Sequence, residues 1–292
     1  MAEIQFLADS ACDFDPKFVK KAGIRVLSCH VDTAEGSFDD GEQFTAQDVY
    51  DLVERTGELP KTSQVTVIEW MDAYREAAEA QKTDVIAVTM NSQGSGTYAA
   101  ACQAARLFKE EEPALAEKLS VRVIDSTGYS APVELAVRRA FRLAENGASA
   151  REVSAYLEEW YSRQTTLLGL GSLDYAKRSG RLNTVAAFVG EVLGLKPIML
   201  LHGSNKVVDK ARGDRALIER MARLYMEKAA APENGDYALV WGTNRDQAKQ
   251  LAAAIKKLGG PAPAIERPIG VCVAINAGPK MLGIGFLGKE KL

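Results

Sequence analysis

The sequence predicts an α/β protein of two domains, the first with a mainly parallel sheet covered by helices on both faces, the second with a mixed or antiparallel sheet. Strand-length apolar runs alternate with helical patterns up to about residue 163, as in parallel sheets joined by helical crossovers. From residue 164 the predicted strands lie closer together, which favours antiparallel pairing. Because 292 residues are many for a single core, we expect domains at 1–163 and 164–292.

The composition is that of an ordinary globular protein, with 47% hydrophobic and 26% charged residues. The net charge is −3 with both signs interspersed, which gives no electrostatic basis for binding nucleic acid or an anionic membrane. No apolar run approaches the roughly 20 residues of a membrane-spanning helix, and the first residues lack the pattern of a signal peptide. We expect a cytoplasmic protein without stable membrane insertion, although transient membrane contact stays open.

The cysteines and histidines give little support to a metal site. Cys12, Cys29, Cys102 and Cys272 lie far apart in the sequence, and no two form a C-x-x-C pair. We therefore expect reduced, mostly buried thiols and no metal. The two histidines, His30 and His202, are too few and too far apart to favour a metal centre or a catalytic triad.

The first half of the chain is predicted to form alternating strands and helices. Strands are predicted at residues 4–8, 24–31, 85–90 and 121–124. Helices are predicted after Asp13 or Asp15, after a capping box at Thr45 and Asp48, at residues 67–80, after Gly96, at about 133–147, and after a capping box at Ser149 and Glu152. Between the second and third of these helices, Lys61-Thr62-Ser63-Gln64 has too little apolar content for core and is predicted as a loop.

The second half is less regular. We predict strands at residues 165–170 and 237–241 and a hairpin that pairs residues 197–201 with 206–210. Helices are predicted at residues 186–195, around Leu217 to Tyr225, and after Asn244. Residues 174–181 form a basic segment broken by a glycine, and residues 269–286 are predicted to hold two strands around Asn276-Ala277-Gly278-Pro279-Lys280.

Residues 84–102 carry the strongest chemical signal. A buried strand runs into Asn-Ser-Gln-Gly-Ser-Gly-Thr and then into an alanine-rich helix. Such a turn directs backbone N–H groups and the hydroxyls of Ser92, Ser95 and Thr97 toward one point. That arrangement favours an anion, either a phosphate or a carboxylate.

Two enzymatic functions remain as alternative interpretations of this turn. Residues 94–99 fit G-x-G-x-x-G/A, and the next strand ends in Asp125, as in a nucleotide-dependent enzyme. However, three residues separate the strand from Gly94, and Asp125 lies beyond the expected offset of about 20 residues. A hydrolase with Ser95 as nucleophile lacks the G-x-S-x-G pattern, because Gln93 stands two residues before the serine.

Taken together, the motifs resemble those of the DegV family along essentially the whole chain. The matching segments, in chain order, are Ala8-Asp9-Ser10-Ala11-Cys12-Asp13, Phe38-Asp39-Asp40-Gly41, Lys61-Thr62-Ser63-Gln64, Asn91-Ser92-Gln93-Gly94-Ser95-Gly96-Thr97-Tyr98, Asp125-Ser126, Ser179-Gly180-Arg181-Leu182, Leu195-Lys196-Pro197-Ile198, Lys210-Ala211-Arg212, Gly278-Pro279 and Gly283-Ile284-Gly285-Phe286. Each is weak alone, but so many in the correct order make the resemblance specific.

This resemblance implies a non-catalytic carrier that binds a long-chain fatty acid, such as palmitate, stearate or oleate, in a tunnel between the domains. By analogy with the FakB members of the family, the protein would present the acid to a separate fatty acid kinase that forms the acyl phosphate. The family pattern places the carboxylate at Thr62 and Ser95. Ser63, Gly96 and Asn276 are supporting candidates, and residues 185–195 are a candidate tunnel wall. Arg181 matches an arginine suited to contact the partner or the phosphoryl group, and no cofactor is implied.

The chain departs from the family pattern beside the predicted carboxylate site. Asn91 and Gly94 stand where the family has a serine and a larger apolar residue, which predicts a looser loop. Asn276 and Lys280 stand where many members have a histidine and a glycine. Asparagine can donate a hydrogen bond but takes up no proton at neutral pH, so the change bears more on the kinase partnership than on lipid binding.

Overall fold

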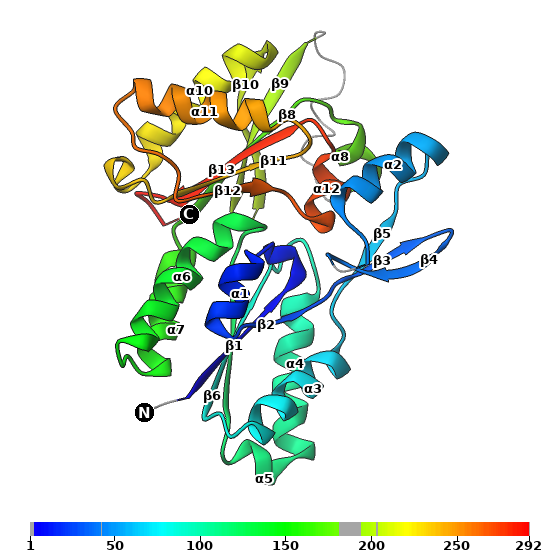
Figure 1. The fold of residues 1–292 in the computed structure, drawn as a ribbon, viewed down its shortest axis with the longest axis vertical. Coiled ribbons are helices and arrows are strands. Elements are labelled where there is room, and N and C mark those ends of the chain that lie inside the picture. Colours follow the sequence, from blue (N-terminus) through cyan, green and yellow to red (C-terminus); the bar gives the residue numbers. More distant parts are fainter. Residues whose placement is uncertain (1–2, 42, 181–193, 203, 292) are drawn as a thin grey trace.

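The computed structural model describes residues 3–41, 43–180, 194–202 and 204–291, and Figure 1 shows their arrangement. The described elements form a four-stranded sheet, a six-stranded sheet and a small three-stranded sheet. The α/β architecture predicted from the sequence is confirmed. The predicted helix at 186–195 and Arg181 lie outside the described residues, apart from Gly194 and Leu195, and Leu195 begins a strand rather than ending a helix.

The first sheet is entirely parallel, in the order β2-β1-β6-β7. Its strands are β1 (Ile4–Asp9), β2 (Arg25–Leu27), β6 (Asp84–Thr89) and β7 (Ser120–Asp125). Because successive side chains point to opposite faces, Leu7 and Val85 pack with α3 (Val67–Glu79) and α4 (Thr97–Glu111). Phe6 and Ile86 face α1 (Pro16–Ala22), α6 (Ala131–Glu145) and α7 (Ala150–Tyr161). Helices therefore cover both faces, as predicted.

The helix starts follow local capping chemistry. The Asp15 carboxylate accepts a hydrogen bond from the backbone N–H of Lys17 at 2.8 Å and so caps α1. The capping boxes predicted at Thr45 and Ser149 are both present, at the starts of α2 (Ala46–Thr56) and α7. Three further short helical segments are α5 (Pro113–Ala116), η1 (Ser10–Cys12) and η2 (Pro232–Asn234).

The second sheet is mixed, in the order β10-β9-β8-β13-β11-β12. Its strands are β8 (Gln164–Leu170), β9 (Leu195–His202), β10 (Ser204–Arg212), β11 (Tyr237–Trp241), β12 (Ile265–Pro268) and β13 (Met281–Leu287). All pairings are antiparallel except that of β11 with β12. β9 and β10 form the predicted hairpin. α10 (Gly213–Lys228) and α11 (Arg245–Lys257) cover the face opposite α6 (Figure 1).

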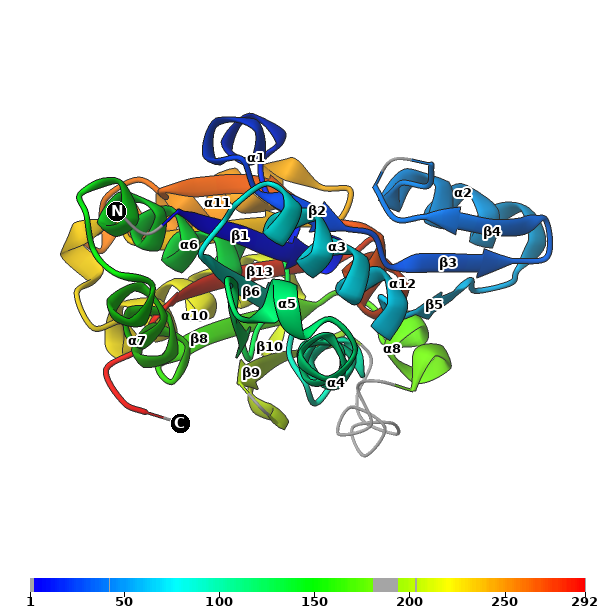
Figure 2. The same ribbon diagram turned by 90° about the horizontal axis from the view of Figure 1, so that it is seen from below.

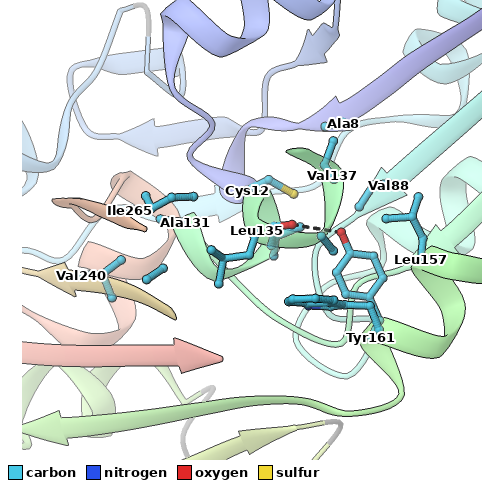
Figure 3. Close-up of a cluster of buried hydrophobic side chains, with 14 of the residues drawn as sticks. Ala8, Cys12, Val88, Ala131, Leu135, Val137, Leu157, Tyr161, Val240 and Ile265 are labelled. Atoms are coloured by element: carbon cyan, nitrogen blue, oxygen red, sulfur yellow. Dashed lines mark hydrogen bonds between the residues drawn. The ribbon is translucent and has the colours of Figure 1, made fainter. Parts of the chain in front are cut away.

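One hydrophobic core joins the two larger sheets through α6. Figure 3 shows Val88 and Ala8 from the first sheet close to α6, with Val240 and Ile265 of the second sheet beyond it. The Tyr161 hydroxyl of α7 donates a hydrogen bond to the Val133 carbonyl oxygen at 3.1 Å, so this buried phenol has a partner. The continuous core places the second sheet at a fixed position over the ends of the parallel strands.

Two predictions about the strands were wrong. Residues 24–31 do not form one strand, because β2 pairs in the parallel sheet whereas β3 (His30–Thr33) pairs with β4 (Gly36–Asp39) and β5 (Lys61–Ser63). The segment Lys61-Thr62-Ser63 is therefore a short strand rather than a loop. The order of this small sheet is β4-β3-β5, and Figure 2 shows it projecting from the side of the molecule together with α2.

The prediction of two strands at 269–286 was also wrong, since the first part is the helix α12 (Val271–Ala277) and only β13 is a strand. Val271 and Ile275 of α12 complete the core of the small sheet and α2. α8 (Asp174–Ser179) packs on the same helix. The Asp13 carboxylate accepts a hydrogen bond from the Gly270 N–H at 2.8 Å and so ties the start of α12 to the first half of the chain.

Candidate functional site

A cavity of about 350 Å³ gathers the segments that the sequence analysis singled out. Thr62, Ser63, Ser95, Gly96 and Asn276, the five predicted carboxylate-site residues, all line it. The other lining residues are Cys29, Gln64, Met90, Gly94, Tyr129, Leu168, Leu201, Asn205, Cys272, Val273 and Ala277. We call this space the hydroxyl cavity. Its volume falls at the lower end of the range for small-molecule sites, about 300–1,000 Å³.

Ser95 lies in the loop between β6 and α4. Its hydroxyl is 2.9 Å from the Thr97 hydroxyl and accepts a hydrogen bond from the Thr97 N–H at 3.2 Å. Because Thr97 is fully buried, this pair fixes the Ser95 side chain at the start of α4. The first N–H groups of a helix lack helical partners and carry partial positive charge. The arrangement suits an anionic or strongly polar ligand group beside Ser95.

Two carboxylates, the buried Asp9 and the half-buried Asp125, hold this loop in place. The Asp9 carboxylate accepts a hydrogen bond from the Met90 N–H at 2.7 Å, and burial raises the pKa of Asp9 to about 7 although this bond lowers it. Asp125 accepts from the N–H groups of Ser92 at 3.2 Å and Thr127 at 2.8 Å. Asp125, the residue that would bind ribose in a nucleotide site, is thus already bonded to the backbone of two loops.

The two glycines of the loop allow other side chains to pack against it. A Cβ at Gly96 would overlap the Gln64 side-chain oxygen, and a Cβ at Gly94 would overlap the Tyr129 hydroxyl. The space left by Gly94 is therefore filled by Tyr129, a residue that the sequence analysis did not single out. Burial, with a smaller contribution from Asp125, raises the pKa of Tyr129 to about 12, so it stays a neutral phenol.

Thr62 and Ser63 enter the cavity from β5. Thr62 pairs with Val31 of β3, and its hydroxyl makes no hydrogen bond to any residue in the described part of the chain. The Ser63 hydroxyl instead donates to the Asp32 carboxylate at 3.3 Å. Thr62 therefore has a free donor for a ligand, whereas Ser63 is the weaker candidate of the two.

His30 is unsuited to act as a base for Ser95. Its Nδ1 lies 3.1 Å from Asp39 and its Nε2 lies 3.0 Å from Glu69, so both ring nitrogens are occupied. Burial lowers the pKa of His30, but its contacts with Glu69 and Asp39 outweigh burial and raise the pKa overall. Because of these contacts, His30 is not available as the base of the alternative Ser95 hydrolase.

Asn276 and Cys272 reach the cavity from α12 rather than from a turn. The Asn276 amide nitrogen donates to the Cys272 carbonyl oxygen at 2.6 Å, one turn earlier in the helix. Its amide oxygen is buried and has no hydrogen-bond partner among the described residues. A second N–H of the same amide group can still serve a ligand.

Two thiols in this cavity were missed by the sequence analysis. Cys29 and Cys272 are 2% and 6% exposed, and both line the cavity. The Cys272 thiol donates to the Asp40 carboxylate at 3.4 Å. The contact with Cys29, followed by burial and by Asp40, raises the pKa of Cys272 well above its usual value. Nothing in the sequence spacing connects these residues, because their proximity depends on the core that α12 shares with the small sheet and α2.

A second cavity of about 900 Å³, which we call the acidic cavity, is lined by Asp40, the residue that accepts the Cys272 thiol. It is lined by both acidic and basic groups, among them Asp13, Asp40, Lys20 and Arg267. Burial, followed by repulsion from Asp40, raises the pKa of Asp13 to about 7. Within the described ranges, no group of three or more His, Cys, Asp or Glu side chains is arranged to hold a metal ion.

No helix within the described ranges combines the length and apolar character that crossing a membrane requires.

The family profile described as "Uncharacterised protein, DegV family" matches residues 3–289 of this chain. A DegV domain-containing protein of Caldanaerobacter subterraneus is 27% identical over 98% of this chain and 99% of its own length. A protein of Thermotoga maritima named "Fatty acid-binding protein" is 26% identical over 97% of each chain.

The fold matches solved structures over its whole length. A DegV family protein from Thermus thermophilus, solved for its fatty acid binding, superposes with a TM-score of 0.87 at 26% identity, covering 98% of this chain and 99% of its own. The match spans both larger sheets and shows that their arrangement is shared.

Proposed function

This chain belongs to the DegV family, and we propose that it binds a long-chain fatty acid whose carboxylate is held in the hydroxyl cavity by Thr62 and Ser95. The observation that carries the proposal is the convergence of β5 and the 90–96 loop on one cavity. Hydroxyl groups and the N–H groups at the start of α4 are donors that suit a carboxylate without a buried cation. The relatives named for fatty acid binding support this ligand class.

In this proposal the acyl chain supplies most of the binding free energy. Burying about 14 methylene groups at about 0.8 kcal/mol each contributes roughly 11 kcal/mol before the cost of ordering the chain. Ordering a flexible tail and restricting the ligand removes several kcal/mol of this gain. Leu168, Leu201 and Val273 are apolar lining residues suited to contact the first part of the tail. The carboxylate contacts then mainly fix the position of the ligand.

We place the tail in a tunnel between two domains, residues 1–163 and 164–292. The boundary falls just before β8, the first strand of the mixed sheet. Leu168 and Leu201 belong to the core that joins the two larger sheets, which supports a tail directed between them. The candidate wall at residues 185–195 falls almost entirely outside the described residues.

The most informative experiment on ligand class is native mass spectrometry of the purified protein, followed by solvent extraction. We expect a mass excess of roughly 250–290 Da, that of a 16- to 18-carbon acid such as palmitate, stearate or oleate, whose tail supplies the burial described above. The extract should contain the free acid. Protein that carries no lipid and also fails to bind added palmitate and oleate would contradict the proposal.

We further propose that the protein is a cytoplasmic carrier rather than an enzyme, and that it presents its acid to a separate fatty acid kinase. Arg181 is the candidate for contact with the partner or the phosphoryl group, and it lies outside the described residues. The test combines the loaded protein, a purified kinase of this type and ATP. Acyl phosphate should form only with all three present, and an R181A variant should form it more slowly while retaining lipid. Lipid retention without acyl phosphate in the wild type would reject the kinase step alone.

A further inference from the structure

Two cysteines from distant parts of the sequence meet in the wall of the hydroxyl cavity. Cys29 follows β2 in the connection to β3, whereas Cys272 lies on α12. Both cysteines line the hydroxyl cavity and belong to the same cluster of buried residues. The neighbouring Cys29 thiol is also the first cause of the raised pKa of Cys272. In the structure all four cysteines are free.

A hydrogen-bonded network fixes the positions of both cysteines. The Cys29 N–H donates to the Ser10 hydroxyl at 2.9 Å, and that hydroxyl donates to the Asp40 carboxylate at 2.8 Å. The same Asp40 oxygen accepts the Cys272 thiol. A second link is the Asp40 N–H, which donates to the Cys29 carbonyl oxygen at 2.9 Å. Asp40 is thus hydrogen-bonded both to the Cys29 backbone and to the Cys272 thiol. These bonds hold the two chain segments that carry the cysteines next to each other.

We propose that Cys29 and Cys272 are a disulfide-forming pair, oxidised by low-molecular-weight disulfides when the hydroxyl cavity is empty. The pair forms a modification site that joins the first half of the chain to α12. The role of an occupied cavity rests on the proposed function, because a bound fatty acid would fill the space through which the oxidant reaches the sulfurs. The pairing of the thiols does not depend on the identity of the ligand.

The chemistry is a two-step thiol–disulfide exchange. One cysteine, as its thiolate, attacks the small disulfide, forms a mixed disulfide and releases one small thiolate. The second cysteine attacks the protein sulfur of that mixed disulfide and releases the other small thiolate. The two protein thiols lose two electrons and two protons, and the small disulfide becomes two thiols. The neighbouring Cys29 thiol, burial and Asp40 all disfavour the Cys272 thiolate, so the reaction should take hours rather than seconds.

The test uses the full chain, stripped of lipid on a hydrophobic resin and incubated with oxidised glutathione at about pH 8.5, where thiolate is more abundant. A C102S variant removes the half-buried Cys102 as a competing thiol. After alkylation of the remaining thiols and digestion without reductant, we expect a cross-linked peptide pair that contains Cys29 and Cys272. Dithiothreitol should remove it, and C29A and C272A variants should not form it.

A thermal melt gives a second readout. A bridge that closes so long a loop should raise the midpoint of unfolding on the order of 5–15 °C, and C29A should show no rise under the same treatment. Separate glutathione adducts on Cys29 and Cys272, a bridge to Cys12 instead, or unreacted thiols after complete modification of Cys102 in the wild type would each overturn the pairing.

A parallel incubation with palmitate separates this inference from the proposed function. We expect palmitate-loaded protein, verified by native mass spectrometry, to form the disulfide at least tenfold more slowly than the stripped protein. An equal rate in loaded protein would reject protection by the ligand. Failure of palmitate to bind, with the disulfide still formed, would reject the proposed function and leave the cysteine pair intact.

Discussion

The hydroxyl cavity and the acidic cavity are linked by the contact between Cys272 and Asp40 but differ in chemistry. The hydroxyl cavity is the smaller, at about 350 Å³, and its described lining consists of hydroxyls, amides, thiols and apolar groups. The acidic cavity is about 900 Å³ and includes Asp13, Lys20 and Arg267. Volume alone would favour the acidic cavity as the ligand site. The available donors favour the hydroxyl cavity, since Thr62 has a free hydroxyl. In the acidic cavity, Arg267 already donates to the Asp13 carbonyl oxygen, and the Asp13 carboxylate already accepts from the Gly270 N–H.

The polar groups of the two cavities therefore have different roles. Arg267 donates to the Asp13 carbonyl oxygen at 2.5 Å and to the Glu134 carboxylate at 2.7 Å. Glu134 is fully buried and also accepts the Asp15 N–H at 2.7 Å. Since truncating one member of such a buried network leaves the others unpaired, these groups are suited to holding the two halves of the chain together. The hydroxyl cavity instead keeps donors available for a ligand.

The largest effect should come from removing the donors of the hydroxyl cavity. A T62V/S95A double variant loses two hydrogen bonds to a charged group, each contributing about 1.5–3 kcal/mol. Affinity for palmitate, measured by displacement of a fluorescent fatty acid, should fall on the order of 100-fold or more with the fold unchanged by circular dichroism. S92A is the matched control, because Ser92 lies in the same loop outside the cavity lining. Unchanged affinity in the double variant would reject Thr62 and Ser95 as ligands.

A change in the acidic cavity should alter stability rather than binding. The pKa of Asp13 is raised from 3.8 to about 7 in the folded protein, so the folded state binds the proton more tightly than the unfolded state. Its contribution to stability is full below about pH 4 and is lost as the pH rises through about 7. In D13N this part of the pH dependence should disappear. The free energy of unfolding should therefore decrease between pH 5 and 8 by about 1–3 kcal/mol less in D13N than in the wild type.

Urea unfolding of wild type and D13N at both pH values measures this difference. Asp9, whose pKa is raised to a similar value, should keep part of the slope in the variant. Palmitate affinity is the control and should change less than about threefold, since a shift of 1.4 kcal/mol would already be tenfold. A large loss of affinity in D13N with unchanged stability would reverse the roles assigned to the two cavities.

A smaller effect is expected where the loop and Gln64 pack together. In G96A the new methyl group overlaps the Gln64 side-chain oxygen, so the flexible amide must move within the cavity. Affinity should fall about three- to tenfold, equivalent to roughly 0.7–1.4 kcal/mol, and a G96A/Q64A double variant should recover part of the loss. No recovery would mean that the methyl group disturbs the start of α4 rather than Gln64.

The smallest effect is expected at Asn276. Its amide already donates to the helix backbone, so only its second N–H can contribute to the ligand. N276A should lower palmitate affinity less than about threefold, less than the loss of an ordinary hydrogen bond of about 1 kcal/mol. A loss comparable to that of the Thr62 and Ser95 variants would move the carboxylate toward α12.

The sequence predicted the wall formed by the first half of the chain better than the wall formed by α12. The strand, loop and helix around Ser95 each carry a local signal, and Thr62 was identified through its motif although β5 was predicted as a loop. Residues 271–277 are almost all apolar, and five of the seven are buried, so no face of the helix is marked by polar residues. A short segment of this kind fits a strand or a helix equally well.

The split of residues 24–31 and the thiol pair have the same explanation. Ser28 and Cys29 leave the parallel sheet to begin the small sheet, and no glycine or proline marks the change. Cys29 and Cys272 meet only because the small sheet and α12 share a core. Contacts of this kind depend on tertiary packing, which local sequence patterns do not encode.

A crystal structure with a long-chain acid brominated at its tail would test the central claim most directly, because the anomalous signal of bromine locates the tail and fixes the direction of the chain. We predict a carboxylate within about 2.6–3.2 Å of the hydroxyl oxygens of Thr62 and Ser95, with the bromine between the two larger sheets. A carboxylate bound in the acidic cavity beside Lys20 or Arg267, or a reversed ligand with bromine at Ser95, would contradict the account.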